Sequence, residues 1–208
     1  PFGRLLPRVA HHIAHLPIRM RGTFGGSLAH ADPASEWCAL ARTFDAVMVA
    51  QGPSGARRIA AADWFDGALS TTLAEGEILR EIELPVLGPG WRCGFVEFSR
   101  RAGDFAIAAA VAGMRIVDGR IAQARIGVGG ATAAPLRSAA AEAVLTGAVP
   151  DTATFTAAGA AAAEAIDDLL ADHHATAELR RDLVRALVPR ALADAMAADA
   201  PATGEGAR

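Results

Sequence analysis

The chain has 208 residues, of which 52% are hydrophobic and 21% are charged, and its formal net charge is −3. This length allows one large domain or two small ones, and the composition argues against a long disordered chain. The weakly acidic balance gives no electrostatic footprint for nucleic acid or anionic lipid. No stretch reaches the roughly 18 consecutive apolar residues of a membrane span without a charge or a glycine. Two cysteines, Cys38 and Cys93, are too few for a disulfide framework or a zinc site, so a cytoplasmic protein is expected.

The N-terminal part of the chain combines helical and strand-like patterns. Apolar residues at helical spacing predict a helix over 5–16, which Pro17 is expected to end. The stretch 21–37 (RGTFGGSLAHADPASEW) is rich in Gly, Ser, Asp and Pro, and it predicts an ordered loop that leads into a helix over 35–43. Strands are predicted over 45–51, 56–65 and 77–85.

The segment 86–91 (VLGPGW) interrupts this pattern and is predicted to link two units. Beyond it, Asp118-Gly119 predicts a hairpin turn between two strands. The expected strands cover 94–101, 105–117 and 121–130, and the expected helices cover 135–145, 152–171 and 177–198. We therefore expect two α+β units, the second being a small meander covered by helices.

The segment 22–27 (GTFGGS) places two adjacent glycines between the hydroxyls of Thr23 and Ser27. Glycines let backbone N–H groups approach an anion closely, and hydroxyls add donors, so a phosphate cradle is physically sensible here. The segment is neither a GxGxxG fingerprint nor a P-loop, because no GK pair followed by Ser or Thr is present. A tight structural turn accounts for the same residues.

Ionisable residues flank this segment on both sides. His30 and Asp32 follow the glycines and would contact whatever the segment holds. Glu36 opens the next helix, where the helix dipole favours it, and as a ligand contact it would accept hydrogen bonds from hydroxyls. The histidines within 11–15 have metal-like spacing but lack a carboxylate or Cys at a matching offset, so a solvated or capping role fits them better.

At 18–37 (IRMRGTFGGSLAHADPASEW) the sequence resembles the FAD-binding (medium) subunit of molybdenum hydroxylases, the group of xanthine dehydrogenase and aerobic carbon monoxide dehydrogenase. Three further motifs follow in the order typical of that family. They are EILREIELP at 77–85, FSRRAGDFAIAAAVAGM at 98–114 and RIGVGGATAAPLRSAAAEAVLTG at 125–147. The resemblance covers about 5–193, which is nearly the whole chain.

The resemblance implies an α+β fold with a defined domain order. Residues 1–88 would form the second subdomain of a two-subdomain FAD-binding domain. Residues 89–196 would form a CO dehydrogenase flavoprotein-like C-terminal domain with a three-stranded antiparallel sheet and helices, followed by a flexible tail over 197–208. The family's first subdomain, which contains an AGGxS/T phosphate-binding turn, is expected to have no counterpart in this sequence.

The resemblance also implies the cofactor contacts, and it implies no catalytic and no metal-binding residue. In the family, the loop matching 23–27 contacts FAD, and so do an acidic residue and an apolar residue further along. The cofactor-binding residues implied here are Thr23, Phe24, Gly25, Gly26, Ser27, Glu36 and Leu79. The family's lysine ahead of the RxGD stretch corresponds to Glu97 in this chain, or to Val96 if the alignment shifts by one residue, and a carboxylate would not favour phosphate.

Electron transfer is the function that the resemblance implies. A molybdopterin-containing large subunit would oxidise the substrate, and a small subunit with [2Fe-2S] clusters would relay electrons to FAD on this chain. The flavin would then pass them to NAD or a quinone-type acceptor, while the protein supplies position and electrostatics. The alternative is a truncated, non-catalytic homologue that serves as a docking scaffold and binds no FAD alone, because half of the pyrophosphate cradle is missing.

Overall fold

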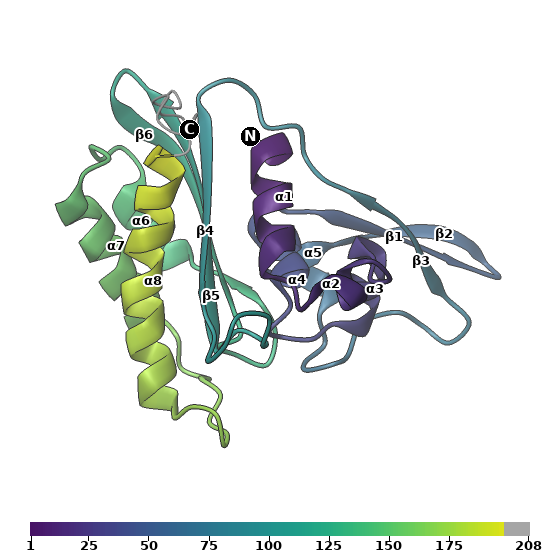
Figure 1. Cartoon of the computed structure of the whole chain (residues 1–208). Coiled ribbons are helices and arrows are strands. Elements are labelled where there is room, and N and C mark those ends of the chain that lie inside the picture. The colour runs from purple at the N-terminus through teal and green to yellow at the C-terminus, as the bar shows by residue number, and fades with distance from the viewer. Residues whose placement is uncertain (198–208) are drawn as a thin grey trace, which may run out of the picture.

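The computed structural model describes residues 1–197, which are arranged as alternating layers of helices and sheets (Figure 1). A sheet near the middle has helices on both faces, and a second sheet lies beyond one of these helical layers (Figure 1). The first helical layer contains α6 (Ala139–Leu145), α7 (Thr152–Glu164) and α8 (Ala177–Ala197). The opposite layer contains α1 (Phe2–His12) and α4 (Glu36–Thr43).

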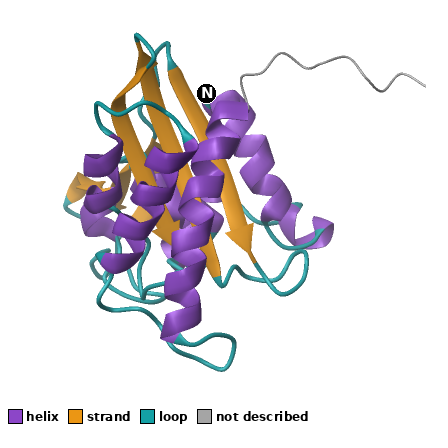
Figure 2. Ribbon diagram, turned by 90° about the vertical axis from the view of Figure 1, so that its left-hand side faces the viewer, coloured by secondary structure: helices purple, strands orange, loops and turns teal. Residues whose placement is uncertain are grey.

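The central sheet is antiparallel and has the strand order β4-β5-β6-β7. Its strands are β4 (Trp91–Phe98), β5 (Ala108–Val117), β6 (Arg120–Gly129) and the two-residue β7 (Leu136–Arg137). Asp118 and Gly119 join β5 to β6 with φ values of 49° and 74°, as a two-residue hairpin turn requires. Figure 2 shows the helices of the first layer crossing the face of this sheet. The expected three-stranded antiparallel sheet is confirmed, with β7 added at its edge.

Side chains alternate along β5 between the two faces of the central sheet, as the period of a strand dictates. Ala110 and Met114 pack with α6, α7 and α8, whereas Ala109 and Val111 pack with α1 and α4. All of these side chains are buried. The near-continuous apolar run in the sequence therefore reflects a strand that is covered on both sides.

The second sheet has the strand order β2-β1-β3, also antiparallel. Its strands are β1 (Val47–Gly52), β2 (Gly55–Ala60) and β3 (Ile78–Glu83). Three short helices accompany it: α2 (Leu16–Arg19), α3 (Phe24–His30) and α5 (Ala61–Trp64). Trp64 is fully buried beneath this sheet, and its indole Nε1–H donates to the carbonyl of Leu28 at 2.8 Å.

Helix α4 belongs to the cores of both sheets. Leu40 and Phe44 pack with α1 and the central sheet, whereas Cys38 and Ala41 pack with β1, β2 and α5. At the central sheet the approach is close, since a Cβ on Gly127 of β6 would lie 1.7 Å from the hydroxyl oxygen of Thr43. One helix thus joins the two sheets into a continuous apolar interior.

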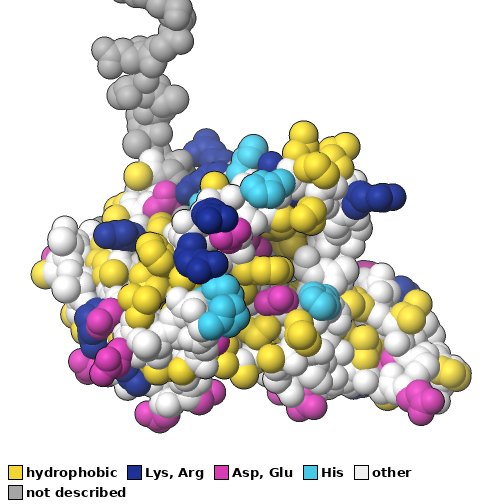
Figure 3. Space-filling view, turned by 60° about the horizontal axis from the view of Figure 1, so that its bottom comes forward, with side chains coloured by type: hydrophobic (Ala, Val, Ile, Leu, Met, Phe, Trp, Pro, Cys, Tyr) yellow, Lys and Arg dark blue, Asp and Glu magenta, His cyan; other side chains and the backbone are white. Residues whose placement is uncertain are grey.

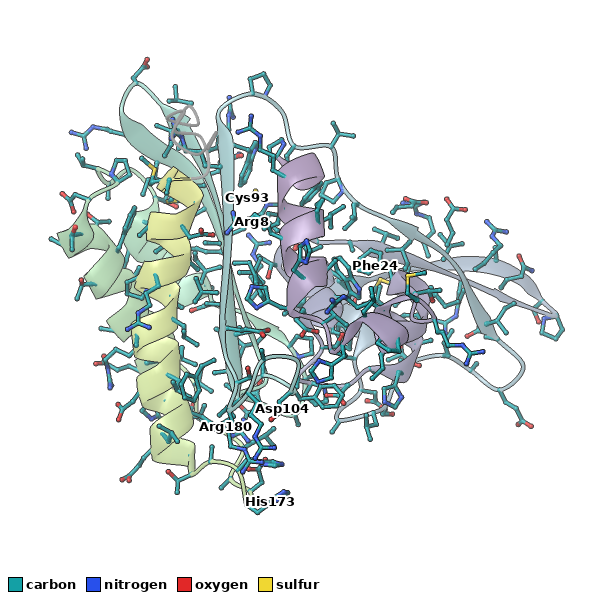
Figure 4. The ribbon with its side chains drawn as sticks, viewed as in Figure 1. Arg8, Phe24, Cys93, Asp104, His173 and Arg180 are labelled. Carbon is teal, nitrogen blue, oxygen red and sulfur yellow. The ribbon has the colours of Figure 1, made fainter. Side chains whose placement is uncertain are left out.

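Strand β4 forms one edge of the central sheet, and two helices cover part of that edge. Asp194 of α8 accepts a hydrogen bond from the backbone N–H of Phe95 at 3.0 Å. The same carboxylate forms an ion pair with Arg8 of α1, so both helical layers are tied together around the strand (Figure 4). A Cβ on Gly94 would lie 2.1 Å from the carbonyl oxygen of Ala191, which shows how closely α8 approaches β4.

Several boundaries differ from the sequence-based expectations. The helix expected over 5–16 is α1, which ends at His12, and Pro17 does not end a helix but lies in the first turn of α2. The cause is Arg19, whose guanidinium donates to the carbonyls of Ile13 and Ala14 at 2.9 and 2.6 Å and holds the chain in a turn.

The expectation of a loop throughout 21–34 is wrong, because Phe24–His30 is α3. The helix expected over 152–171 stops at Glu164, since Ile166 is buried in the core and the N–H of Leu170 donates to the carbonyl of Ala131 at 2.9 Å. The strand expected over 56–65 ends at Ala60, and the chain continues as α5.

Within the part of the chain that the structure describes, no helix has the length and apolar character to cross a bilayer. Of the tail expected over 197–208, residues 198–208 lie outside the part of the chain that the structure describes.

Candidate functional site

Helix α3 contains the glycine-rich segment, and its first turn is fixed by Thr23. The Thr23 hydroxyl oxygen accepts a hydrogen bond from the N–H of Gly26 at 2.9 Å, which is a side-chain N-cap. The N–H of Ser27 donates to the carbonyl of Thr23 at 3.1 Å. Two of the backbone donors in this turn are therefore already paired within the chain.

Apolar contacts hold α3 against its neighbours. The ring of Phe24 packs edge-on against Trp37 of α4, with 4.9 Å between ring centroids. A Cβ on Gly25 would lie 3.8 Å from Ile82 of β3, so this glycine faces the second sheet. Leu79 of β3 packs into the same cluster as Phe24 and Ile82. The structure thus brings Phe24, Gly25 and Leu79 together on the inner side of α3.

A cavity of about 260 Å³ opens on the other side of α3. It is lined by Ile13, Ala14, Ile18, Ser27, His30, Asp32, Ser35, Glu36, Gly103, Asp104 and Phe105. Its walls come from the turn after α1, from α2, from α3, from the start of α4 and from the loop between β4 and β5. This mixture of apolar walls and a few convergent polar groups is typical of a small-molecule site.

Glu36 is the buried carboxyl of this cavity. It is only 5% exposed and is the first residue of α4, after the N-cap residue Ser35. Burial raises the pKa of Glu36 to about 7, because the charged form loses its hydration, while a backbone hydrogen bond at the helix start opposes the rise. Near neutral pH this carboxyl is therefore able to donate as well as accept hydrogen bonds.

A second cavity, of about 590 Å³, adjoins the first and shares Asp32, Gly103, Asp104 and Phe105 with it. Asp104 and Arg180 are near each other at the lower end of the central sheet (Figure 4). Phe105 is 67% exposed at the mouth of both cavities. Figure 3 shows hydrophobic, histidine, arginine and acidic side chains gathered on this end of the molecule.

Arg180 closes the inner wall of the second cavity. Its guanidinium donates to the carbonyls of Ile107 and Gly130 and to the carboxylate of Asp172, each at 2.6 Å. A buried cation with these partners is compensated in charge and fixed in position. Arg180 therefore connects α8 to the residue before β5, to the residue after β6 and to the loop before α8.

Of the sequence-predicted site residues, Ser27 and Glu36 line one cavity. Phe24, Gly25 and Leu79 are not among the residues that line this cavity, because they face the inner cluster instead. The lining also excludes Thr23 and Gly26, which form the cap. His30 and Asp32 do reach the cavity, as expected from their place after the glycines.

Glu97 lies outside the 260 Å³ cavity, on the face of β4 that is turned toward α1. Its Oε1 is 3.1 Å from Nδ1 of His12, and its side chain is 5% exposed. The carboxylate therefore serves as a partner for a histidine.

Sequence reasoning missed the contribution of the loop between β4 and β5. Gly103, Asp104 and Phe105 line both cavities, although the sequence analysis placed them only within the motif at 98–114 and assigned them no cofactor contact. Gly103 has φ of +84°, and a Cβ there would lie 2.6 Å from the His15 ring. The available sequence signal was the RAGDF pattern, because glycine next to aspartate between two strand-like segments favours a turn.

Comparison with known proteins agrees with this geometry. Residues 3–87 match the FAD binding domain in molybdopterin dehydrogenase, and residues 94–195 match the CO dehydrogenase flavoprotein C-terminal domain. The chain is 38% identical to the nicotine 6-hydroxylase medium subunit of Paenarthrobacter nicotinovorans over 92% of its own length and 66% of that subunit. It is 35% identical to the carbon monoxide dehydrogenase medium chain of Afipia carboxidovorans over 89% of its own length and 64% of that chain.

Solved structures show the same likeness. Quinoline 2-oxidoreductase from Pseudomonas putida 86 has a chain that superposes with a TM-score of 0.86 at 36% identity, covering 93% of this chain and 67% of that one. Carbon monoxide dehydrogenase from Hydrogenophaga pseudoflava gives a TM-score of 0.88 at 33% identity, covering 94% and 68%. The chain thus spans roughly two thirds of the length of the proteins it matches.

The chain contains two α+β domains. In chain order, they match the FAD binding domain in molybdopterin dehydrogenase and the CO dehydrogenase flavoprotein C-terminal domain, and this pair defines a flavoprotein subunit. The chain belongs to the family of FAD-binding medium subunits of molybdenum hydroxylases, which includes the medium chains of carbon monoxide dehydrogenases. The expected family, fold class and FAD cofactor class are thereby confirmed.

Proposed function

We propose that this chain forms part of the FAD site of a molybdenum-dependent hydroxylase and that the site lies at the cavity between α3, α4 and the β4–β5 loop. The observation that supports this most directly is the meeting of Ser27, Glu36 and Phe105 around one cavity. Ser27 and Glu36 come from the motif at 18–37 and Phe105 comes from the motif at 98–114, and the fold brings the two motifs to one place.

The side chains that line the cavity include hydrogen-bonding groups and an aromatic ring, which are the kinds of group that a flavin cofactor contacts. When bound, FAD would supply the redox chemistry, accepting electrons and passing them on. Ser27 would offer a hydroxyl, Glu36 would exchange hydrogen bonds with cofactor hydroxyls or carbonyls, and Phe105 would offer an aromatic face to a planar ring. The predicted contacts at Thr23, Phe24, Gly25, Gly26 and Leu79 stay proposals, with the start of α3 as the anion-facing part.

The size of the cavity limits how much of the cofactor this chain would enclose. A volume of about 260 Å³ lies below the 300–1,000 Å³ that pockets for drug-sized ligands usually have. A dinucleotide is larger still. We infer that these residues form one wall of the FAD site and that the family's other subdomain would form the rest.

The proposed role in the whole protein is electron transfer. We propose that electrons arrive from [2Fe-2S] clusters of a small subunit, after a molybdopterin-containing large subunit has oxidised the substrate, and leave through FAD to NAD or a quinone-type acceptor. We further propose the domain limits 1–88 and 89–196, and a cytoplasmic location, which the buried free thiols of Cys38 and Cys93 suit.

Reconstitution with FAD tests this proposal. The purified chain is mixed with FAD, desalted, and examined for flavin absorption and quenched flavin fluorescence. We expect Glu36→Ala and Phe105→Ala to weaken binding, with exposed Glu178→Ala as the matched control. A chain that stays colourless and cannot be reconstituted would support the alternative of a docking scaffold that binds no FAD alone.

A further inference from the structure

A buried carboxylate near the end of β4 lacks one hydrogen-bond partner. The side chain of Glu97 is 5% exposed, and its Oε1 lies 3.1 Å from Nδ1 of His12. Its other oxygen, Oε2, is buried and has no hydrogen-bond partner among residues 1–197. Buried polar groups in folded proteins are almost always hydrogen-bonded, and a buried charge is costly unless it is paired. A donor for Oε2 would therefore stabilise this carboxylate.

The side chains next to Glu97 in the sheet offer no free donor. Its partner on β5 is Ala109, whose methyl group cannot donate. Two residues further along the chain, the hydroxyl of Ser99 donates to the carbonyl of Arg101 at 3.0 Å. A hydroxyl has one proton to donate, so Ser99 keeps none for Glu97.

The polar side chains of α1 near this carboxylate are also engaged. Arg8 lies one helical turn before His12 and forms an ion pair with Asp194 of α8. His12 uses its Nδ1 for the first oxygen of Glu97, and its ring lies edge-on to Phe95 with 5.0 Å between ring centroids. The described part of the chain thus leaves Oε2 of Glu97 to a donor from outside.

Glu97 lines a surface cavity of about 460 Å³, a volume within the usual range for small-molecule pockets. The walls come from the end of α1, from the end of β4 and from the loop after β4. The terminal torsion of a glutamate side chain has a broad energy minimum, so the free oxygen can turn toward a donor in the cavity. The other lining residues are His11, His12, Phe98, Ser99, Ala102 and Gly103, of which the 260 Å³ cavity shares only Gly103.

The chemistry of this cavity selects an organic cation. An anionic oxygen makes its strongest hydrogen bond with a charged donor. No group of His, Cys, Asp and Glu side chains within residues 1–197 is suited to hold a metal ion. A single free oxygen matches the point donor of an ammonium better than the fork of a guanidinium, which pairs with two oxygens. Phe98 is 42% exposed and adds an aromatic ring, which attracts both cations and alkyl chains.

We propose that the 460 Å³ cavity binds a small primary alkylammonium ion, whose N–H donates to Oε2 of Glu97 and whose alkyl part lies against Phe98. The ion completes the hydrogen bonding of the carboxylate and brings a compensating positive charge to it. Binding is non-covalent and requires no flavin, so the site does not depend on the proposed function.

Three small probes, added to the chain without FAD, test this site. n-Butylammonium has a charge and N–H donors, tetramethylammonium has a charge without a donor, and n-butanol has a donor without a charge. Each would be titrated into nitrogen-15-labelled chain while the backbone amide signals of Ser99 and Ala102 are followed by NMR. We expect saturable shifts with n-butylammonium only. The same shifts with either of the other probes, or no saturable shift with any probe, would overturn the proposal.

Glu97→Gln removes the negative charge with little change in shape. It should weaken the binding of n-butylammonium by about tenfold or more, the loss expected for a hydrogen bond to a charged group. Glu178→Gln, in the exposed first turn of α8, is the matched control and should bind as the wild type does. Unchanged affinity in a folded Glu97→Gln variant would contradict the proposal.

His12→Ala keeps the test decisive if Glu97→Gln fails to fold. The variant removes the donor at Oε1, so the carboxylate of Glu97 has two free oxygens and should bind n-butylammonium more tightly. A merely apolar cleft would instead lose affinity, because the ring of His12 is part of its wall. Equal or weaker binding in His12→Ala would therefore contradict the proposal. Since FAD is absent throughout, these results are independent of whether the chain binds a flavin.

Discussion

At the scale of single residues, the hydroxyl of Thr23 has a structural role in capping α3 in addition to its predicted contact with a ligand. Its oxygen accepts from the N–H of Gly26 and so begins α3. The same oxygen is one of the predicted FAD contacts. A hydroxyl has two acceptor lone pairs and one donor proton, so the cap leaves the proton available for a second partner. The cap therefore constrains the geometry of any cofactor contact at this position.

Thr23→Ala tests the cap. The expected loss in the free energy of unfolding is about 1 kcal/mol, because one backbone donor of the first turn loses its acceptor. Thr23→Ser keeps the hydroxyl and should retain most of the stability. Urea denaturation followed by circular dichroism measures both variants. Equal midpoints for Thr23→Ala and the wild type would show that the cap contributes nothing.

The buried carboxyl of Glu36 gives the stability a definite pH dependence. Its pKa is raised in the folded chain from 4.5 to about 7, so the folded state binds more protons than the unfolded state between these values. The proton on Glu36 therefore adds to the free energy of unfolding. This contribution is fully present below pH 4.5 and is lost as the pH rises through about 7. The free energy of unfolding changes by on the order of 3 kcal/mol over this range.

Comparing wild type with Glu36→Gln isolates this contribution. The wild-type free energy of unfolding should fall relative to that of Glu36→Gln as the pH is raised from 4.5 to 7. The hydrogen bond to Glu97, which is the main cause of the raised pKa of His12, is present in both proteins, so its contribution cancels in the difference, and only the smaller effect of Glu36 on His12 does not. Parallel curves for the two proteins, obtained by urea titration at each pH, would contradict the raised pKa of Glu36.

The sequence predicted part of the candidate site and missed the rest for a physical reason. Ser27 and Glu36 were identified from a local motif, and the structure places both at one cavity. Phe105 and Gly103 were not identified as lining residues, because they reach the cavity only through the pairing of β4 with β5 and the packing of the loop against His15. Such contacts depend on long-range packing, which local spacing does not encode.

At the scale of elements, the packing of α8 on β4 depends on the absence of a side chain. Gly94 lies where a Cβ would be 2.1 Å from the carbonyl oxygen of Ala191 and 2.6 Å from the N of Ala195. Real Cβ atoms do not approach backbone this closely, and backbone cannot rotate away as a side chain can. The helix would have to move outward as a unit to admit a methyl group.

Gly94→Ala is therefore expected to destabilise the chain by about 1–3 kcal/mol or more, the range for overpacking a close-packed interior. Gly3→Ala is the matched control, because a Cβ there meets nothing within 4 Å. It lies in α1 and should be neutral or slightly stabilising. Thermal unfolding measures both. A Gly94→Ala variant as stable as the control would mean that α8 lies further from β4 than the 2.1 Å distance between a Cβ on Gly94 and the carbonyl oxygen of Ala191 implies.

Elements with a strong local signal agree with the sequence, and the others were decided by tertiary contacts. The Asp118-Gly119 hairpin and the helix over 36–43 follow their patterns closely. Helix α3 was missed because adjacent glycines have low helix propensity, yet Thr23 caps it and the Trp64 indole binds its Leu28 carbonyl. The alanine-rich pattern that begins at 152 contains no stop signal, so burial of Ile166 rather than propensity ends α7.

At the scale of the whole molecule, the two domains share a core. Leu40 and Phe44 on one side of α4, and Cys38 and Ala41 on the other, are buried against different sheets. Helix α4 shares this cover with α1 at the central sheet and with α3 and α5 at the second sheet. The only covalent crossing between the second sheet and β4 is the segment 84–90, in which Val86 is 96% exposed and Leu87 is buried.

Cutting the chain in this segment should not separate its halves. A protease site introduced at 86–89 and cleaved under native conditions should give two fragments that co-elute in gel filtration and part only in denaturant. The reason is that α1 and α4 remain buried against the central sheet through Leu5, Leu40 and Phe95. Fragments that elute separately in native buffer would show that the domains hold together through the linker alone.

The contact of Arg8 and Asp194 around β4 has a consequence for self-association. An open strand edge is a template on which another chain can add a strand, and natural proteins block such edges with charges or cover. Here the carboxylate occupies the N–H of Phe95, and an arginine from the first helix holds that carboxylate in place. The N-terminal helix α1 thus helps to prevent another chain from adding a strand to β4. Proteolytic loss of α1 would remove the arginine that holds this carboxylate and would uncover the apolar face beside β4, which would make the chain prone to self-association.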